Sequence, residues 1–308
     1  MADAANREST AQVTVDVVSE PDQPAPPRVE AASGQVTISW ETPQLNGAQL
    51  TGYRIIPNIG DPIEVDVRNS FVWDGLDNGV DYTFTIVALS DLGESEASGP
   101  SEVATPNQVP ESPSVRSVTF QDGALFVEWD EPTNLGSDIL DYEIRISGQP
   151  PLTQLSGGAT EFLWDGLING DNYTFEVRAR NDAGWGEWGP SSTPEHPAGV
   201  PDAPGIGVTA RTQESGALQV NWVKPVSDNG DQIIDYLIES SAGGDPVPIT
   251  GADTLTTRWA DLTNGVETSF RVRARNRAGL GPWSPWSNAV SPCVAPTAPV
   301  ITLSLIHI

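Results

Sequence analysis

Short stretches in which apolar and polar residues alternate recur along the chain. Three of them end in a tryptophan, at Trp40, Trp129 and Trp222, and these tryptophans lie 89 and 93 residues apart. Alternation with a period of two residues is typical of a β-strand that buries one face. Together with frequent turn residues, a repeat of about 90 residues predicts one β-sandwich for each repeat.

Other apolar and aromatic positions repeat with the same period, and we expect them to form the cores of the sandwiches. A tyrosine follows each of these tryptophans on the next strand, and a leucine then precedes an Asn-Gly turn. A later strand carries a second tyrosine in the first two repeats. The expected core positions are Trp40, Tyr53, Leu76 and Tyr82, then Trp129, Tyr142, Leu167 and Tyr173, and finally Trp222, Tyr236 and Leu262.

These positions resemble the pattern of fibronectin type III domains, and the resemblance extends from residue 24 to residue 296. It implies an all-β chain of three tandem immunoglobulin-like β-sandwiches in an extended array. In this family a tyrosine of strand F forms a tyrosine corner, in which its hydroxyl bonds to nearby backbone. Tyr82 and Tyr173 match that tyrosine, whereas the third repeat has Thr268 at the same place.

Clusters of proline mark the boundaries between the repeats, and short proline-rich links predict a semi-rigid rod. We expect a tail or the last strand of a preceding immunoglobulin-like module at 1–23, modules one, two and three at 24–106, 107–197 and 198–296, and a linker with a non-native tail at 297–308. The tail is expected because Leu303–Ile308 resembles the translation of a sequencing-library adapter. The chain is therefore expected to be a fragment of a longer protein.

The charge of the chain restricts its partners. With 42 acidic and 15 basic side chains the net charge is −27, which argues against nucleic acid and anionic lipid as ligands. No apolar run reaches the roughly 18 residues of a membrane span, so no membrane insertion is expected. Lys224 is the only lysine against 14 arginines, which we interpret as the genome bias of a bacterium. With Cys293 as the only cysteine, packing alone must stabilise each sandwich.

The residue types needed for catalysis are scarce. The chain has two histidines, His196 and His307, so that no Ser-His-Asp arrangement is expected inside a module. Metal-spaced Cys and His pairs and phosphate-binding loops do not occur in the sequence. The acidic stretch 228–231 lacks the bidentate Glu of a calcium loop, and we interpret it as a turn. We therefore expect no enzyme activity, no cofactor and no metal site.

In the second and third modules, arginines occupy alternate positions of one strand, and two tryptophans follow on the adjoining last strand. Alternate residues of a strand share a face, so these arginines should point outward and stack on the tryptophans, at about 0.5 to 1 kcal/mol per contact. The first module has Val87 and Leu89 instead, and no tryptophan after them. The expected ladder consists of Arg178, Arg180, Trp185 and Trp188 in module two and Arg271, Arg273, Arg275, Trp283 and Trp286 in module three.

The stretch Trp283–Ser287 resembles the WSxWS box of class I cytokine receptors, although the paired cysteines of that family are missing. We interpret the box as a stabilising device, with two alternatives: an aromatic strip that binds sugar or protein, and a receptor. The predicted function is a non-catalytic structural or adhesive spacer array of a secreted or cell-surface protein, monomeric in isolation, with an unknown protein or glycan ligand. The alternative is a set of accessory modules of a secreted polysaccharide-degrading enzyme whose catalytic domain lies outside this chain.

Overall fold

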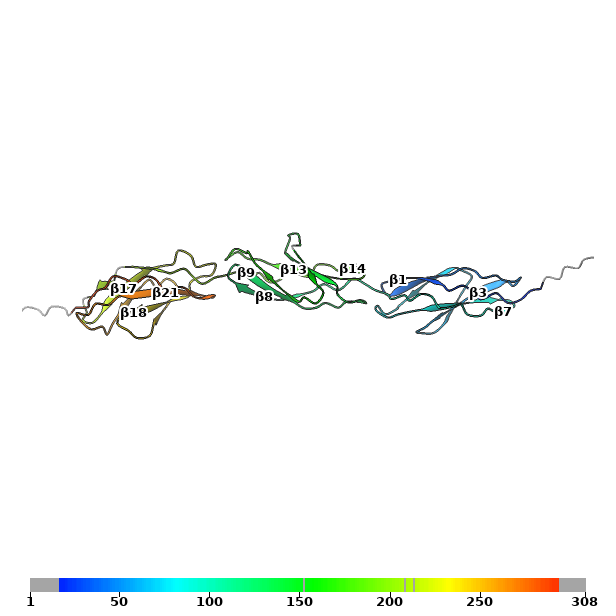
Figure 1. The fold of residues 1–308 in the computed structure, drawn as a ribbon, viewed down its shortest axis with the longest axis horizontal. Helices are drawn as coiled ribbons and strands as arrows, with labels where there is room; N and C mark the ends of the chain where they lie inside the picture. The colour runs from blue at the N-terminus through cyan, green and yellow to red at the C-terminus, as the bar shows by residue number, and fades with distance from the viewer. Residues whose placement is uncertain (1–16, 152, 208, 213, 294–308) are drawn as a thin grey trace, which may run out of the picture.

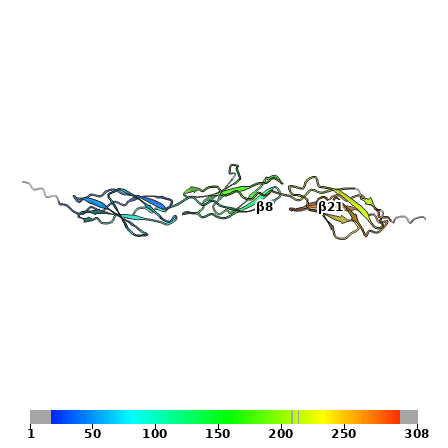
Figure 2. The same cartoon turned by 180° about the vertical axis from the view of Figure 1, so that it is seen from behind.

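Three β-sandwiches follow one another in a line in the computed structural model (Figure 1), which describes residues 17–151, 153–207, 209–212 and 214–293. The view from behind shows the same linear arrangement of three separate sandwiches (Figure 2). The described residues contain strands and turns and no helix, so the expected all-β fold class is confirmed. Most of the strand expected within 1–23 lies outside the described residues. The linker and tail expected at 297–308 lie entirely outside them.

Each module consists of a three- or four-stranded sheet packed on a second, four-stranded sheet. In module one the order is β1-β2-β5 against β4-β3-β6-β7. The strands are β1 (Arg28–Ala32), β2 (Gln35–Ser39), β3 (Leu50–Pro57), β4 (Ile63–Val65), β5 (Ser70–Asp74), β6 (Phe84–Ser90) and β7 (Gly93–Glu94).

Modules two and three repeat this topology. The orders are β12-β9-β8 against β11-β10-β13-β14, and β15-β17-β16 with β20 on β17 against β19-β18-β21-β22. The strands of module two are β8 (Val115–Gln121), β9 (Ala124–Trp129), β10 (Asp141–Ile146), β11 (Thr153–Ser156), β12 (Glu161–Trp164), β13 (Phe175–Asn181) and β14 (Gly184–Trp185). Those of module three are β15 (Gly205–Ile206), β16 (Ala210–Arg211), β17 (Leu218–Val223), β18 (Asp235–Ser240), β19 (Val247–Thr250), β20 (Thr256–Trp259), β21 (Phe270–Asn276) and β22 (Gly279–Leu280).

Three separate hydrophobic cores fill the spaces between the sheets, and each is made from residues of one module. Each core contains a tryptophan from one sheet against a tyrosine from the other. The ring centroids are 5.2 Å apart for Trp40 and Tyr53, 5.6 Å for Trp129 and Tyr142, and 5.5 Å for Trp222 and Tyr236. The leucines of the repeat, Leu76, Leu167 and Leu262, pack against these cores half-buried.

The second tyrosine holds the corner between two strands. The backbone N–H of Asp77 donates to the Tyr82 hydroxyl at 3.2 Å, and that of Ile168 to the Tyr173 hydroxyl at 3.1 Å. In module three, Thr268 is buried and forms the backbone bridge to Val290. Module three therefore retains the strand pairing of the corner without the side-chain clamp.

Both junctions between modules use the same backbone contacts. The Asn-Gly turn of one module meets a glycine in the turn of the next, so that a Cβ on Gly79 would lie 3.2 Å from Gly136, and one on Gly170 would lie 3.2 Å from Gly230. The N–H of Gly79 donates to the Pro106 carbonyl at 2.8 Å. Hydrogen-bonded links of this kind favour a fixed linear arrangement of adjacent modules.

The junction between modules two and three has an additional side-chain clamp. The Arg277 guanidinium of module three lies 3.9 Å from the centre of the Phe120 ring of module two. It also pairs with Glu195 of module two at 3.1 Å and with Asp231 of its own module at 2.6 Å. Module two has Asp182 at the position of Arg277, so the first junction cannot form this clamp.

Candidate functional site: the arginine–tryptophan faces

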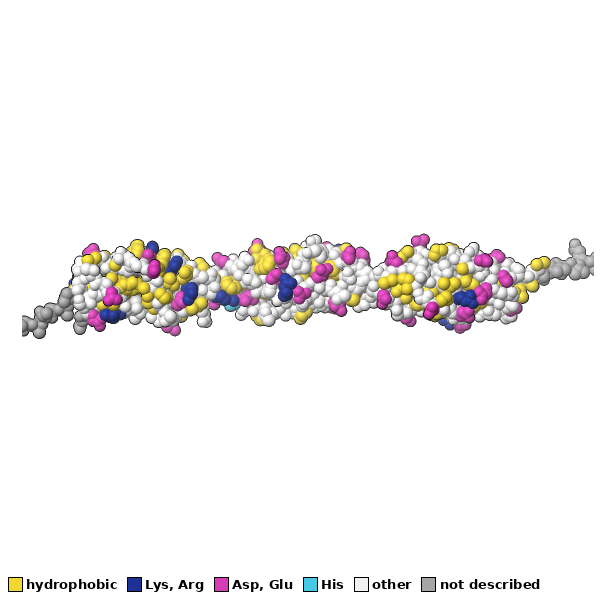
Figure 3. Space-filling model, turned by 90° about the horizontal axis from the view of Figure 1, so that it is seen from below, with side chains coloured by type: hydrophobic (Ala, Val, Ile, Leu, Met, Phe, Trp, Pro, Cys, Tyr) yellow, Lys and Arg dark blue, Asp and Glu magenta, His cyan; other side chains and the backbone are white. Residues whose placement is uncertain are grey.

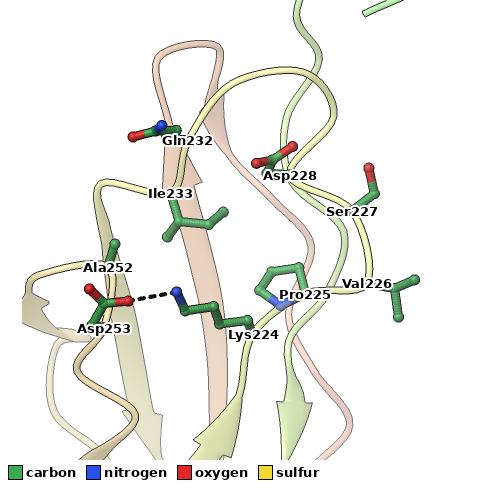
Figure 4. Close-up of a pocket in the computed structure, with 9 residues that line it drawn as sticks. All are labelled: Lys224, Pro225, Val226, Ser227, Asp228, Gln232, Ile233, Ala252 and Asp253. Carbon is green, nitrogen blue, oxygen red and sulfur yellow. Dashed lines mark hydrogen bonds and ion pairs between the residues drawn. The ribbon is translucent and has the colours of Figure 1, made fainter. Parts of the chain in front are cut away.

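Polar and charged side chains line hollows on the described surface. The one drawn in Figure 4 lies beside the turn that follows β17, and an ion pair of 2.6 Å between Lys224 and Asp253 crosses its wall. Its remaining lining consists of aliphatic, amide, hydroxyl and one further acidic side chain. Among the described residues no group of three or more His, Cys, Asp or Glu is placed to hold a metal ion.

The acidic stretch 228–231 forms a turn. Asp228 accepts a hydrogen bond from the N–H of Gly230, and Asp231 accepts one from the N–H of Gln232 while it pairs with Arg277. These carboxylates are therefore engaged by backbone donors and a guanidinium, which agrees with the interpretation as a turn.

In module two, arginine and tryptophan side chains form a continuous stack on the outer face of the sheet β11-β10-β13-β14. Trp185 lies between Arg180, at 5.4 Å, and Arg178, at 4.9 Å. Trp188 lies between Arg178, at 4.6 Å, and Arg145, at 4.1 Å. Both indoles thus have cations on two sides, and the stack begins and ends with an arginine.

Each arginine of this stack also has a carboxylate on a neighbouring strand. Arg178 pairs with Glu143 at 2.6 Å, and Arg145 pairs with Glu176 at 2.6 Å. Arg180 pairs with Asp141, the residue opposite it in the register of β10 and β13. A hydrogen bond from Gln154, and then Arg180, lowers the pKa of Asp141. The face is therefore compensated in charge along its whole length.

In module three the stack is shifted along the sheet and is shorter. Trp283 lies between Arg273, at 4.4 Å, and Arg271, at 4.9 Å, and Trp286 contacts Arg271 at 4.7 Å. Arg271 pairs with Glu239 at 2.5 Å. Counted from Gly184 and Gly279, Trp283 matches Trp188, and 44% of Trp286 is exposed at the end of the stack.

One residue of the expected ladder, Arg275, is placed differently from the prediction. Arg275 stacks on neither tryptophan in the described structure; it pairs with Asp235 instead. Its neighbour across the sheet, where module two has Trp185, is Leu280, so no indole reaches it. Arg273 stacks on Trp283 as predicted, and the residue opposite it is Leu237, so no acid pairs with it among the described residues.

Module one replaces the stack with an ion-pair cluster. Arg54 lies on the middle strand β3 and pairs with Glu64 at 2.8 Å and with Glu94 at 2.7 Å. Hydrogen bonds with these two glutamates raise the pKa of Arg54, and the one with Arg54 lowers the pKa of Glu94. Val87 lies opposite Arg54 on β6.

Serine hydroxyls complete the hydrogen bonding of the last segment in module three. The segment was expected to be a full strand, but β22 ends at Leu280. Beyond it, the backbone N–H groups of Val272 and Phe270 donate to the hydroxyls of Ser284 and Ser287, each at 3.0 Å. The serines of the Trp-Ser-Pro-Trp-Ser stretch therefore attach the tryptophan-bearing segment to β21.

Sequence reasoning did not identify Arg145 of module two, which stacks on Trp188 from the middle strand. It also missed the serine rungs, which module one repeats with Ser95, Ser98 and Ser101. The serine spacing of three residues after the last turn is a signal that the sequence carries. The stacking of Arg145 depends on the register between β10 and β13, which the sequence pattern does not specify.

Three successive sandwiches, each with its own hydrophobic core, define a tandem array of modules. The family model described as "Fibronectin type III domain" matches residues 22–104, 109–195 and 202–290. The chain belongs to the fibronectin type III domain family, with three copies of the domain.

Several curated proteins resemble the chain over most of its length. Receptor-type tyrosine-protein phosphatase F of Bos taurus is 28% identical over 279 residues, which are 82% of this chain and 14% of the relative. Tyrosine-protein phosphatase Lar of Drosophila melanogaster is 27% identical with the same coverage. Fibronectin type-III domain-containing protein 3A of Mus musculus is 25% identical and covers 86% of this chain and 23% of the relative. The chain thus spans less than a quarter of the length of these relatives.

Among solved structures, the one titled chicken CNTN1 FN1-FN3 domains aligns with 89% of this chain and 99% of its own. The sequence identity is 18% and the TM-score is 0.34.

Proposed function

We propose that the chain is a non-catalytic spacer and adhesive array of a secreted or cell-surface multidomain protein. The observation that carries this proposal is the division of the core into three clusters, each confined to one module. Each described sandwich is thus closed on its own core, as expected of modules that act as separate units in a row. What they offer a partner is length and outer surface.

Two further observations support this role. The junctions carry backbone hydrogen bonds and, at the second junction, the Arg277 clamp, as expected of an element that sets a distance. Acidic side chains are spread over the visible face of all three modules (Figure 3), and like charges along a rod favour extension. Within the described residues no helix is long and apolar enough to cross a bilayer.

The named relatives are animal proteins, whereas the near absence of lysine predicts a bacterial source, which stays a prediction. The location outside the cell rests on the family resemblance. The alternative role beside a polysaccharide-degrading domain would use the same three modules as a spacer, and no described residue favours it.

Small-angle X-ray scattering of the full chain tests the spacer role. We expect the profile of a rod, whose pair-distance distribution has a long tail, and a broader distribution with a shorter mean length for Arg277→Ala. The matched control is Arg258→Ala, which removes an exposed ion pair with Glu214 within module three and should leave the profile unchanged. A compact wild-type particle, with one symmetrical peak in the distribution, would refute the spacer role.

A further inference from the structure

An arginine lies at the centre of the outer sheet face in each module. The number of carboxylates paired with it among the described residues falls from two in module one to one in module two and none in module three. Arg54 of module one has two glutamate partners, and Arg178 of module two has Glu143. Arg273 of module three occupies the same register position as Arg178, opposite Leu237 instead of a glutamate. Among the described residues no carboxylate pairs with Arg273.

The acids nearest to Arg273 in the register are already engaged. Asp235 pairs with Arg275, and Glu239 pairs with Arg271. The Nε atom of Arg273 is buried and has no hydrogen-bond acceptor among the described residues. The buried Nε is out of reach of a partner, but a carboxylate can give the outer nitrogens of this guanidinium paired, charge-assisted hydrogen bonds.

The surroundings of Arg273 are apolar on the side of the middle strand. Leu237 is half-buried, and Pro248, its partner on the edge strand β19, is exposed. On the other side the guanidinium stacks on Trp283 at 4.4 Å. Among the described arginines of this face, the one without a carboxylate partner therefore lies between an aliphatic strip and an indole.

We propose that this face of module three binds a partner protein through one Asp or Glu side chain flanked by aliphatic residues. The carboxylate pairs with the outer nitrogens of Arg273, and the aliphatic neighbours cover Leu237 and Pro248. The inference specifies a contact that the proposed adhesive role leaves open, and it rests on that role.

Charge favours a protein segment over an acidic polysaccharide. The chain has a net charge of −27. It therefore repels a polymer that carries a carboxylate on every sugar, because Arg273 can pair with one of those carboxylates and the others face acidic surface. One carboxylate within an otherwise neutral and apolar segment satisfies Arg273 without that repulsion. Aliphatic side chains of a protein partner can also bury the apolar surface of Leu237 and Pro248, whereas a hydrated sugar acid would bury little of it.

The test follows the side-chain Nε–H resonances of the full chain labelled with ¹⁵N-arginine, while the peptide acetyl-Leu-Glu-Leu-amide is added at constant ionic strength. We expect a saturable shift of the Arg273 resonance and no saturable shift of the Arg178 resonance, which serves as an internal control. The isosteric peptide acetyl-Leu-Gln-Leu-amide should bind about tenfold more weakly, as expected for the loss of one charge-assisted pair.

Two reciprocal variants exchange the environments of the two arginines. Leu237→Glu gives Arg273 the acid that Arg178 has in module two, and should abolish the saturable shift. Glu143→Leu removes that acid in module two, and should create a saturable shift at Arg178. If one variant fails to fold, the other still decides the question.

Equal shifts with the Glu and Gln peptides, or a wild-type shift at Arg178 as large as that at Arg273, would overturn the proposal. Tighter binding of trigalacturonate would assign the site to an acidic sugar and would also overturn it, as would a shift of Arg273 on raising the chain concentration alone. Scattering from the same samples separates the two claims: an extended rod without peptide binding keeps the spacer role and removes the site.

Discussion

Modules two and three have the same topology and the same aromatic core, yet they treat their outer arginines differently. In module two a continuous stack holds Arg145, Arg178 and Arg180, each with its own acid. In module three the stack is shorter, Arg275 lies off it, and Arg273 has an indole but no acid. The two modules thus share an interior and differ on the outer face. Glu143 gives Arg178 a carboxylate partner in module two, whereas Leu237 at the matching position leaves Arg273 without one among the described residues.

The largest expected effect concerns the cores that the two modules share. Trp129→Ala and Trp222→Ala each remove a buried indole and should cost about 3 to 5 kcal/mol. Because the cores are separate, each variant should lower one calorimetric transition, that of its own module. A loss of all three transitions in either variant would show that the modules are not independent.

The next effect separates the two stacks by a double-mutant cycle. Trp283→Ala should cost about 1 to 3 kcal/mol, and Arg273→Ala should then add almost nothing, because Trp283 is the one stacking partner of Arg273 in the described structure. In module two, Arg178→Ala should remain costly after Trp188→Ala, because Arg178 keeps Trp185 and Glu143. Denaturant unfolding measures both cycles. Additive effects of Trp283 and Arg273 would remove the stack as an explanation.

A smaller effect distinguishes the core tyrosines. The Tyr236 hydroxyl donates to the Ala252 carbonyl at 3.2 Å, whereas the buried Tyr142 hydroxyl has no partner among the described residues. Burial raises the pKa of Tyr142 to about 12. Tyr236→Phe should cost about 1 kcal/mol, the net value of one hydrogen bond, and Tyr142→Phe should cost nothing or stabilise. Equal losses in thermal stability would contradict this difference.

The smallest expected effect is the response to acid. In module two a hydrogen bond from Ser191 lowers the pKa of Glu176, and one from Gln154 lowers that of Asp141. A carboxyl whose folded pKa lies below its unfolded value contributes stability above the unfolded value, which is lost as pH falls through the folded pKa. In module three a hydrogen bond from Lys224 lowers the pKa of Asp253, and this carboxyl is so exposed that solvent screens the interaction. Between about pH 5 and pH 3, module two should therefore lose more thermal stability than module three; the opposite order would contradict this account.

The repeated core positions could be predicted from the sequence, whereas the neighbours of the outer arginines could not, because they depend on the register between strands. The period of the tryptophans and tyrosines identified the three cores, since a buried aromatic pair is needed wherever a sandwich closes. The predicted ladder included Arg275 because alternate residues of a strand share a face, which places side chains on a face without naming their neighbours. Which residue of β18 lies opposite Arg273, and whether an acid or Leu237 stands there, follows from strand pairing that is fixed only in three dimensions.

The most direct test of the open face is an acid titration of the unliganded full chain, followed through the arginine Nε–H resonances. Acid protonates carboxylates, and the resonance of an arginine changes when its carboxylate partner loses its charge. We predict a large shift for Arg178, which faces Glu143, and a much smaller one for Arg273. A shift of Arg273 as large as that of Arg178 would show that a carboxylate of the chain already pairs with it, and would contradict the account.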